Sequence, residues 1–125
     1  MALEQPVFKV GICTAAADLS AKQFYGVKVT ATTAVNIMTV KGEAAFGILQ
    51  NKPTINHSAD VMLIGVSKVM VGTGNLAAGA FWEFDADGTA ITAEASKAAQ
   101  GVVLIGANAG ELATVVIGCA NGAKD

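Results

Sequence analysis

The chain has 125 residues, a formal net charge of −2 at pH 7, and only lysines among its eight basic residues. Because arginine is best suited to bidentate phosphate and base contacts, and nucleic-acid binding needs a clustered basic surface, this composition argues against a nucleic-acid partner. Charged residues make up 14% of the chain, against about 25% in a typical domain. Either the surface is rich in alanine, threonine and glycine, or other subunits cover part of it, and the second alternative favours an oligomer or a larger assembly.

The length fits one domain, residues 1–125, with an N-terminal arm at residues 1–14 that holds one short strand at 8–12. The first ten residues lack the basic region of a signal peptide, and no apolar run is long enough to cross a membrane. We therefore expect no membrane partner and synthesis in the cytoplasm. In that compartment Cys13 and Cys119 are expected to be free thiols, and a disulfide that joins them is the alternative.

After the arm, short apolar runs alternate with polar or glycine-rich turns. The run at residues 61–71 alternates for eleven residues, and both of its faces are largely apolar until Lys68. This pattern is typical of a strand in a small barrel or sandwich, or at a subunit interface, and Gly65 predicts a bend or bulge. The predicted strands after the arm are 25–31, 35–40, 44–49, 61–71, 81–84, 89–92, 101–106 and 112–117.

Strands at this spacing predict an all-β fold, a small antiparallel β-barrel or sandwich with an extended N-terminal arm. At most one or two short helices are expected: residues 15–24 fit a single helical turn or a loop, and residues 93–100 fit a short helix. Hairpins are predicted between the runs 44–49 and 61–71, and between 101–106 and 112–117. In the first hairpin, Asn51 and Lys52 are interpreted as shaping the turn rather than as a site.

Two motifs resemble ligand sites but have simpler explanations. Residues 72–77 match a dinucleotide fingerprint, yet the helix that such a site needs would be interrupted at Gly79 and by the aromatic run that follows. Residues 83–94 have the acid and glycine spacing of a calcium loop, but Glu83 stands where aspartate is expected. Turns between strands explain both motifs, so we predict no cofactor and no metal site.

No catalytic constellation is apparent either. His57 is the one histidine, and it lies in a polar loop, where a pair with Cys13 would lack a third orienting group. The glycosylation sequon Asn56-His57-Ser58 has no meaning without a secretory route. The sequence therefore predicts a protein that is not an enzyme.

Aromatic residues gather at Phe81, Trp82 and Phe84. Strand alternation places Trp82 and Phe84 on one face, and Phe81 and Glu83 on the other. The cluster fits a core plug or an interface anchor, and both interpretations stay open, since aromatic residues dominate many interfaces. The candidate interface residues are Phe81, Trp82, Phe84 and, in the arm, Phe8 and Val10.

Several segments along the chain form a recognisable series. They begin with Asp18-Leu19-Ser20-Ala21-Lys22-Gln23-Phe24-Tyr25, followed by Val27-Lys28-Val29, and the most recognisable is Gly47-Ile48-Leu49-Gln50-Asn51-Lys52-Pro53. Gly65-Val66-Ser67-Lys68-Val69, the turn Asp85-Ala86-Asp87-Gly88 and the final hairpin at 101–117 follow. In this order, the segments resemble the capsid decoration (cement) proteins of tailed bacteriophages, and residues 54–58 and Ala80 depart from the family pattern.

The resemblance implies a β-rich structural protein on the outer surface of the virion, assembled in the host cytoplasm. Its partners would be the major capsid protein and itself, as a trimer at local three-fold sites that strengthens the expanded head against packaged DNA. We expect the arm to be loose in the free protein and to order on the shell. The alternative is a small ligand-binding β-module for carbohydrate or calcium.

Overall fold

The computed structural model describes residues 2, 5–94 and 99–118, and these residues contain strands and turns but no helix. The chain is therefore all-β, as the sequence predicts. The strands are β1 (Gln5–Ala15), β2 (Gly26–Ala31), β3 (Ala34–Ile37), β4 (Gly47–Leu49), β5 (Ser58–Met70), β6 (Phe81–Phe84), β7 (Ala90–Thr92), β8 (Gly101–Ile105) and β9 (Leu112–Ile117).

The first five strands close into a barrel. Their order is β1-β3-β2-β4-β5, and β5 returns to pair with β1. The pairing of β1 with β3 is parallel, through Thr14 and Ala34, whereas the other pairs are antiparallel. Small and branched side chains fill the interior: Cys13, Ala15, Leu19, Val27, Val35, Leu49, Ala59 and Val61.

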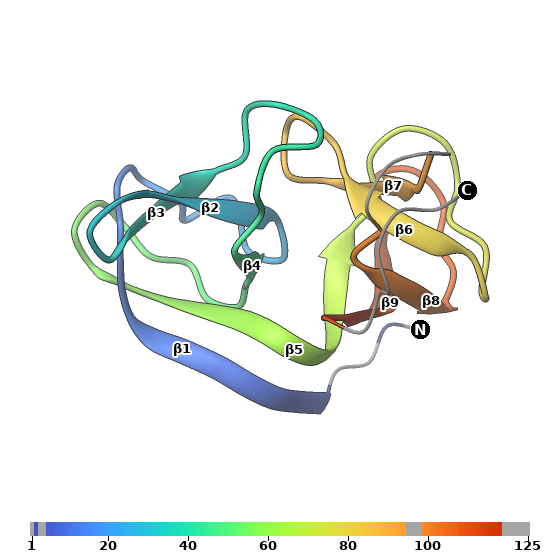
Figure 1. Ribbon diagram of the computed structural model, residues 1–125, viewed down its shortest axis with the longest axis horizontal. Helices are drawn as coiled ribbons and strands as arrows, with labels where there is room; N and C mark the ends of the chain where they lie inside the picture. The colour runs from blue at the N-terminus through green and yellow to red at the C-terminus, as the bar shows by residue number, and fades with distance from the viewer. Residues whose placement is uncertain (1, 3–4, 95–98, 119–125) are drawn as a thin grey trace.

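A second ring of strands uses β5 again. It runs β5-β9-β8-β6-β7, and a parallel bridge between Val71 and Ala90 links its last strand back to the end of β5. In Figure 1, β1 and β5 run side by side along one long edge of the molecule, and β5 alone belongs to both rings. The larger core cluster, which includes Trp82 and Phe84, lies mainly in this second ring. Because both rings share β5, neither can lose that strand without opening the other.

The predicted hairpins are confirmed by the strand register. Ile48 pairs with Met62 across β4 and β5, and Val103 pairs with Val115 across β8 and β9. Gly65 is confirmed as a bend, because its φ is +142° and the register with β1 shifts beside it. A residue with a side chain rarely adopts this φ, which explains glycine at that position.

One local prediction was wrong. The strand in the arm is longer than residues 8–12, since β1 extends over Gln5–Ala15 by pairing with β5 through several bulges. Of the two alternatives for the segment 15–24, the structure shows the loop: bends and turns follow β1, and Phe24 adopts a left-handed φ of +69°. The second predicted helix, at 93–100, includes residues 95–98, which lie outside the described residues.

The turn after β4 is held by amide side chains. Asn51 donates from Nδ2 to the carbonyl of Ser58 at 2.9 Å, and its Oδ1 accepts from the N–H of Asp60 at 3.0 Å. Gln50 donates from Nε2 to Ser67 Oγ at 2.9 Å, which satisfies a fully buried hydroxyl. The interpretation of Asn51 as a turn-shaping residue is confirmed.

The loop after β3 makes the stability of the fold depend on pH. The Glu43 carboxylate accepts the backbone N–H groups of Thr39 at 2.7 Å and Val40 at 2.9 Å, and it pairs with Lys28 at 3.0 Å. These backbone hydrogen bonds, and then the lysine, lower the pKa of Glu43 to about 2. The folded pKa lies below the unfolded value, so the stabilisation is present above pH 4.5 and is lost as pH falls toward 2.

We therefore predict that Glu43→Gln destabilises the protein at pH 7 but has progressively less effect at lower pH. The free energy of unfolding, measured by urea titration at several pH values, checks this. Wild type and variant should converge below pH 4.5, the ordinary pKa of the carboxyl group. A difference that stays constant down to pH 2 would contradict the prediction.

Candidate interaction surface

The structure separates the candidate interface residues into two groups. Trp82 and Phe84 are buried, their rings meet edge to face with centroids 4.9 Å apart, and Trp82 Nε1 donates to the carbonyl of Val116 at 3.0 Å. Val10 packs against the core of the first barrel. The burial of Trp82 and Phe84 favours the core interpretation that the sequence left open for the aromatic cluster, and Val10 is half-buried.

Phe8 and Phe81 instead lie exposed, and the strand register places both on one continuous surface. Phe81 pairs with Val102 across β6 and β8, and Phe8 pairs with Ile64 across β1 and β5. Between them Val66 pairs with Val116 across β5 and β9. Directly paired residues of antiparallel strands point to the same side of the sheet.

We call this surface the outer apolar face. It crosses five strands, β6, β8, β9, β5 and β1, its members are apolar, and Lys68 borders it two residues beyond Val66 on the same side of β5. Four members are substantially exposed, with Phe8 at 52%, Leu104 at 49%, Ile64 at 47% and Phe81 at 44%. The register places Phe8, Ile64, Val66, Phe81, Val102 and Val116 on it, and Leu104, exposed at the bulge of β8 between Val103 and Ile105, completes the set.

Single exposed apolar residues are ordinary on protein surfaces, but a contiguous apolar patch marks a site of interaction. The sequence singled out only Phe8 and Phe81 from this face. Its other members lie in runs that are apolar on both sides, so alternation does not say which side faces outward. The register of β9 between β5 and β8 carries that information, and it is a long-range property of the fold.

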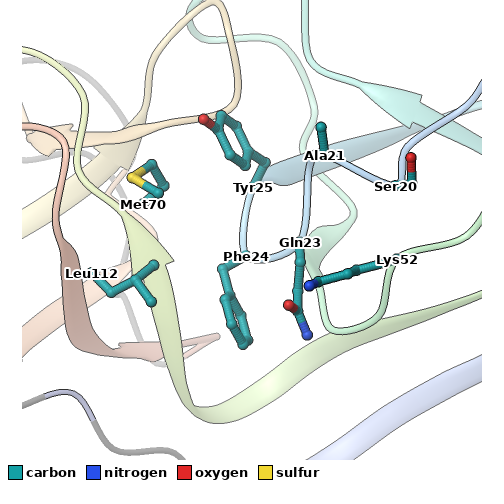
Figure 2. A pocket seen from close by; sticks show the side chains of 8 residues that line it. All are labelled: Ser20, Ala21, Gln23, Phe24, Tyr25, Lys52, Met70 and Leu112. Atoms are coloured by element: carbon teal, nitrogen blue, oxygen red, sulfur yellow. The ribbon is translucent and has the colours of Figure 1, made fainter.

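A hollow of about 320 Å³ lies where the segment before β2 meets the ends of β5 and β9 (Figure 2). Met70 and Leu112 form its apolar side together with the rings of Phe24 and Tyr25, and Lys52 reaches across its other side. The lining residues are Ser20, Ala21, Gln23, Phe24, Tyr25, Lys52, Met70 and Leu112.

Phe24 holds a strained backbone conformation in the wall of this hollow. Its φ of +69° is rare for a bulky residue. Two backbone hydrogen bonds hold this conformation. The N–H of Phe24 donates to the carbonyl of Leu49 at 2.7 Å, and the carbonyl of Phe24 accepts from the N–H of Met70 at 3.0 Å. These bonds tie the segment before β2 to both β4 and β5.

The other residues with possible chemistry have structural partners. Burial raises the pKa of the Cys13 thiol, which disfavours the reactive thiolate, and Cys119 lies outside the described residues. The ring of His57 is hydrogen-bonded to the hydroxyl of Thr54. Glu83 is buried and accepts the backbone N–H of Glu94 at 2.7 Å.

The two ligand-like motifs form turns and strands. No helix follows Gly74 in the described part of the chain, and residues 83–94 begin within β6. Among the described residues, no group of three or more histidine, cysteine, aspartate or glutamate side chains could hold a metal ion. The described ranges also contain no helix that is long and apolar enough to cross a membrane.

The architecture is thus a small closed β-barrel whose longest strand continues into a second ring of strands. The same fold occurs in the crystal structure of the N base of the head fiber gp8.5 of bacteriophage phi29, with a TM-score of 0.65 at 17% sequence identity. The match covers 91% of this chain and 98% of that chain. No protein-family profile matches the sequence, and no curated protein matches it.

Proposed function

We propose that this chain is a structural protein of a tailed-phage head that acts as a decoration (cement) protein. The observation that carries the proposal is the fold, which covers nearly the whole of the phi29 head fiber base. The sequence segments that resemble decoration proteins support it independently, because they do not depend on the strand pairing that defines the fold. The protein then binds the outside of the expanded head, as a trimer at local three-fold sites, and stabilises the shell against internal DNA pressure.

The outer apolar face supplies the physical basis for such a role. Apolar surface removed from water contributes about 25 cal/mol per Å², and three copies that dock together add avidity without new contacts. The work is mechanical, so the protein needs neither catalysis nor a cofactor. Its partners are the major capsid protein and its own copies, rather than nucleic acid or a membrane.

Sedimentation with phage heads tests the proposal. Purified protein is mixed with expanded heads that lack it and with unexpanded precursor heads, and the pelleted protein is measured. We expect binding to expanded heads only, and DNA retention to higher temperature once the protein is bound. Protein that stays in the supernatant with both kinds of head would rule out the proposed function.

The outer apolar face yields a specific prediction. Leu104→Asp places a charge in this face and should weaken association with heads, or between copies, by at least about tenfold, because burying an unpaired carboxylate costs more than 1.4 kcal/mol. Ile55→Asp is the matched control, because Ile55 is equally exposed but lies in the loop before β5.

Far-UV circular dichroism should show both variants folded, and analytical ultracentrifugation and head sedimentation measure association. Equal loss of binding by Leu104→Asp and Ile55→Asp would show that the outer apolar face has no special role.

A further inference from the structure

We propose that the hollow beside Phe24 binds an acidic peptide segment of a partner protein, one that carries an apolar side chain next to its carboxylates. The inference rests on the proposed function only in identifying the partner protein as a capsid subunit. The lining of the hollow shares no residue with the outer apolar face, although Met70 and Leu112 lie on the same side of β5 and β9 as Val66 and Val116, four residues away along each strand.

Positive charge gathers around this hollow in a chain that is acidic overall. Lys52 lines it directly. Lys68 lies over the ring of Phe24, with Nζ 5.4 Å from the centroid, and Lys22 lies 4.8 Å over the ring of Tyr25. Three of the eight lysines are therefore at this site, and none of the eight lining side chains is acidic. Outside the lining, Asp18 Oδ1 accepts the N–H of the lining residue Ser20 at 3.1 Å, and Asp87 interacts electrostatically with Lys22.

The opposite side of the hollow is apolar. Met70 and Leu112 come from adjacent paired positions of β5 and β9, so both point to the same side of the sheet. A thioether next to a branched side chain forms an adaptable apolar surface, as is common where proteins bind peptides. Figure 2 shows these two residues across the hollow from Lys52 and Gln23.

The strain at Phe24 is consistent with a binding role. A bulky residue with positive φ costs about 1–3 kcal/mol in general, and such residues concentrate at binding sites. Here the conformation turns the Phe24 ring into the wall of the hollow, where Lys68 covers it. Phe24 therefore joins the cationic and the apolar sides of one site.

Charge and shape together point to a peptide. The lysines complement carboxylates, while the apolar side needs a side chain that a simple anion does not have. Nucleic acid would need a longer basic track and would meet repulsion from a chain whose net charge is −2. A short acidic segment with one leucine or methionine satisfies both sides of the hollow.

Peptide titration of the isotope-labelled full chain, followed by NMR, tests the inference. The probe is a capped octapeptide that alternates aspartate with leucine, and the control peptide has asparagine in place of aspartate. We expect saturable shifts of the backbone amides at Gln23, Lys52 and Met70 with the acidic peptide only. Added salt should weaken the binding, because the contacts are partly between exposed charges.

Two charge-reversal variants make the test specific. Lys52→Glu should weaken binding of the acidic peptide about tenfold, because a surface ion pair is lost and a repulsion is added. Lys9→Glu changes the net charge equally but lies on β1, away from the hollow, and should leave binding within about twofold.

The inference is overturned if the amide peptide binds equally well, if both variants lose affinity equally, or if the hollow shows no saturable shift. Equal shifts with inorganic phosphate or oligothymidine would also overturn it, since they would indicate a general anion site. Failure of the wild type to sediment with heads would contradict the proposed function but leave the peptide result unaffected.

Discussion

Replacing Trp82 with alanine is expected to lower the free energy of unfolding by about 4 kcal/mol, the middle of the range for large-to-small aromatic substitutions in cores. Trp82 is 0% exposed and contacts Phe84 edge to face. Its indole N–H also satisfies the carbonyl of Val116 at the junction of β8 and β9. The variant therefore loses apolar burial together with the hydrogen bond that the indole donates.

This loss is a large part of the stability of a small domain, which is about 5–15 kcal/mol. Urea unfolding followed by far-UV circular dichroism measures it, because Trp82 is the one tryptophan and the variant has no indole fluorescence. Because β5 belongs to both rings, we expect a single transition that shifts as a whole. Unchanged stability would contradict the structure of the second ring.

Phe81→Ala is the matched control on the neighbouring residue. Phe81 points to the other side of β6 and is largely exposed, so its replacement should change the free energy of unfolding by less than about 1 kcal/mol. The same variant removes the end of the outer apolar face, so its main effect should appear in association with copies or heads. Trp82, which points inward, is thus expected to determine stability, and its neighbour Phe81, which points outward, is expected to determine association.

This contrast also shows what the sequence could predict. Alternation alone placed Trp82 and Phe84 on one face and Phe81 on the other, which the burial of the two residues confirms. Alternation could not predict the burial of every residue, however. Glu83 lies on the same side of β6 as the exposed Phe81, yet Glu83 is buried. That burial depends on a backbone N–H from Glu94, eleven residues away.

Strands and hairpins were predicted well because their signals are local. The turn residues and the two-residue period determine where β4, β5, β8 and β9 begin and end, within a few residues. The closure of the barrel was not predictable in this way. It depends on the parallel pairing of Thr14 with Ala34 and on a bulged ladder between β1 and β5, neither of which leaves a periodic pattern.

The hollow was beyond sequence reasoning for a similar reason. From the sequence, Asn51 and Lys52 are interpreted as residues that shape a turn, and the hydrogen bonds of Asn51 agree with that role. The side chain of Lys52, however, lines the same hollow as residues from segments that are distant in sequence, including Met70 and Leu112. The unusual φ of Phe24 helps to bring them together, and an ordinary propensity argument does not predict positive φ for phenylalanine.

Gly101→Ala is expected to destabilise the protein by about 3 kcal/mol, although it adds a single methyl group. A Cβ at Gly101 would lie 1.8 Å from the carbonyl oxygen of Val116, a backbone atom that cannot move without separating β8 from β9. It would also approach Trp82 Nε1 at 3.4 Å, beside the hydrogen bond from Trp82 to that same oxygen. The substitution therefore strains the strand pair and its main side-chain contact together.

Gly110→Ala separates this effect from the general cost of replacing a glycine. Gly110 has a φ of +84° in the turn between β8 and β9, and a Cβ there would meet no atom within 4 Å. Its replacement should cost about 1 kcal/mol, from backbone strain alone. Urea unfolding of both variants compares the two. If Gly110→Ala proves as damaging as Gly101→Ala, then backbone conformation rather than close packing against Val116 explains the glycine at position 101.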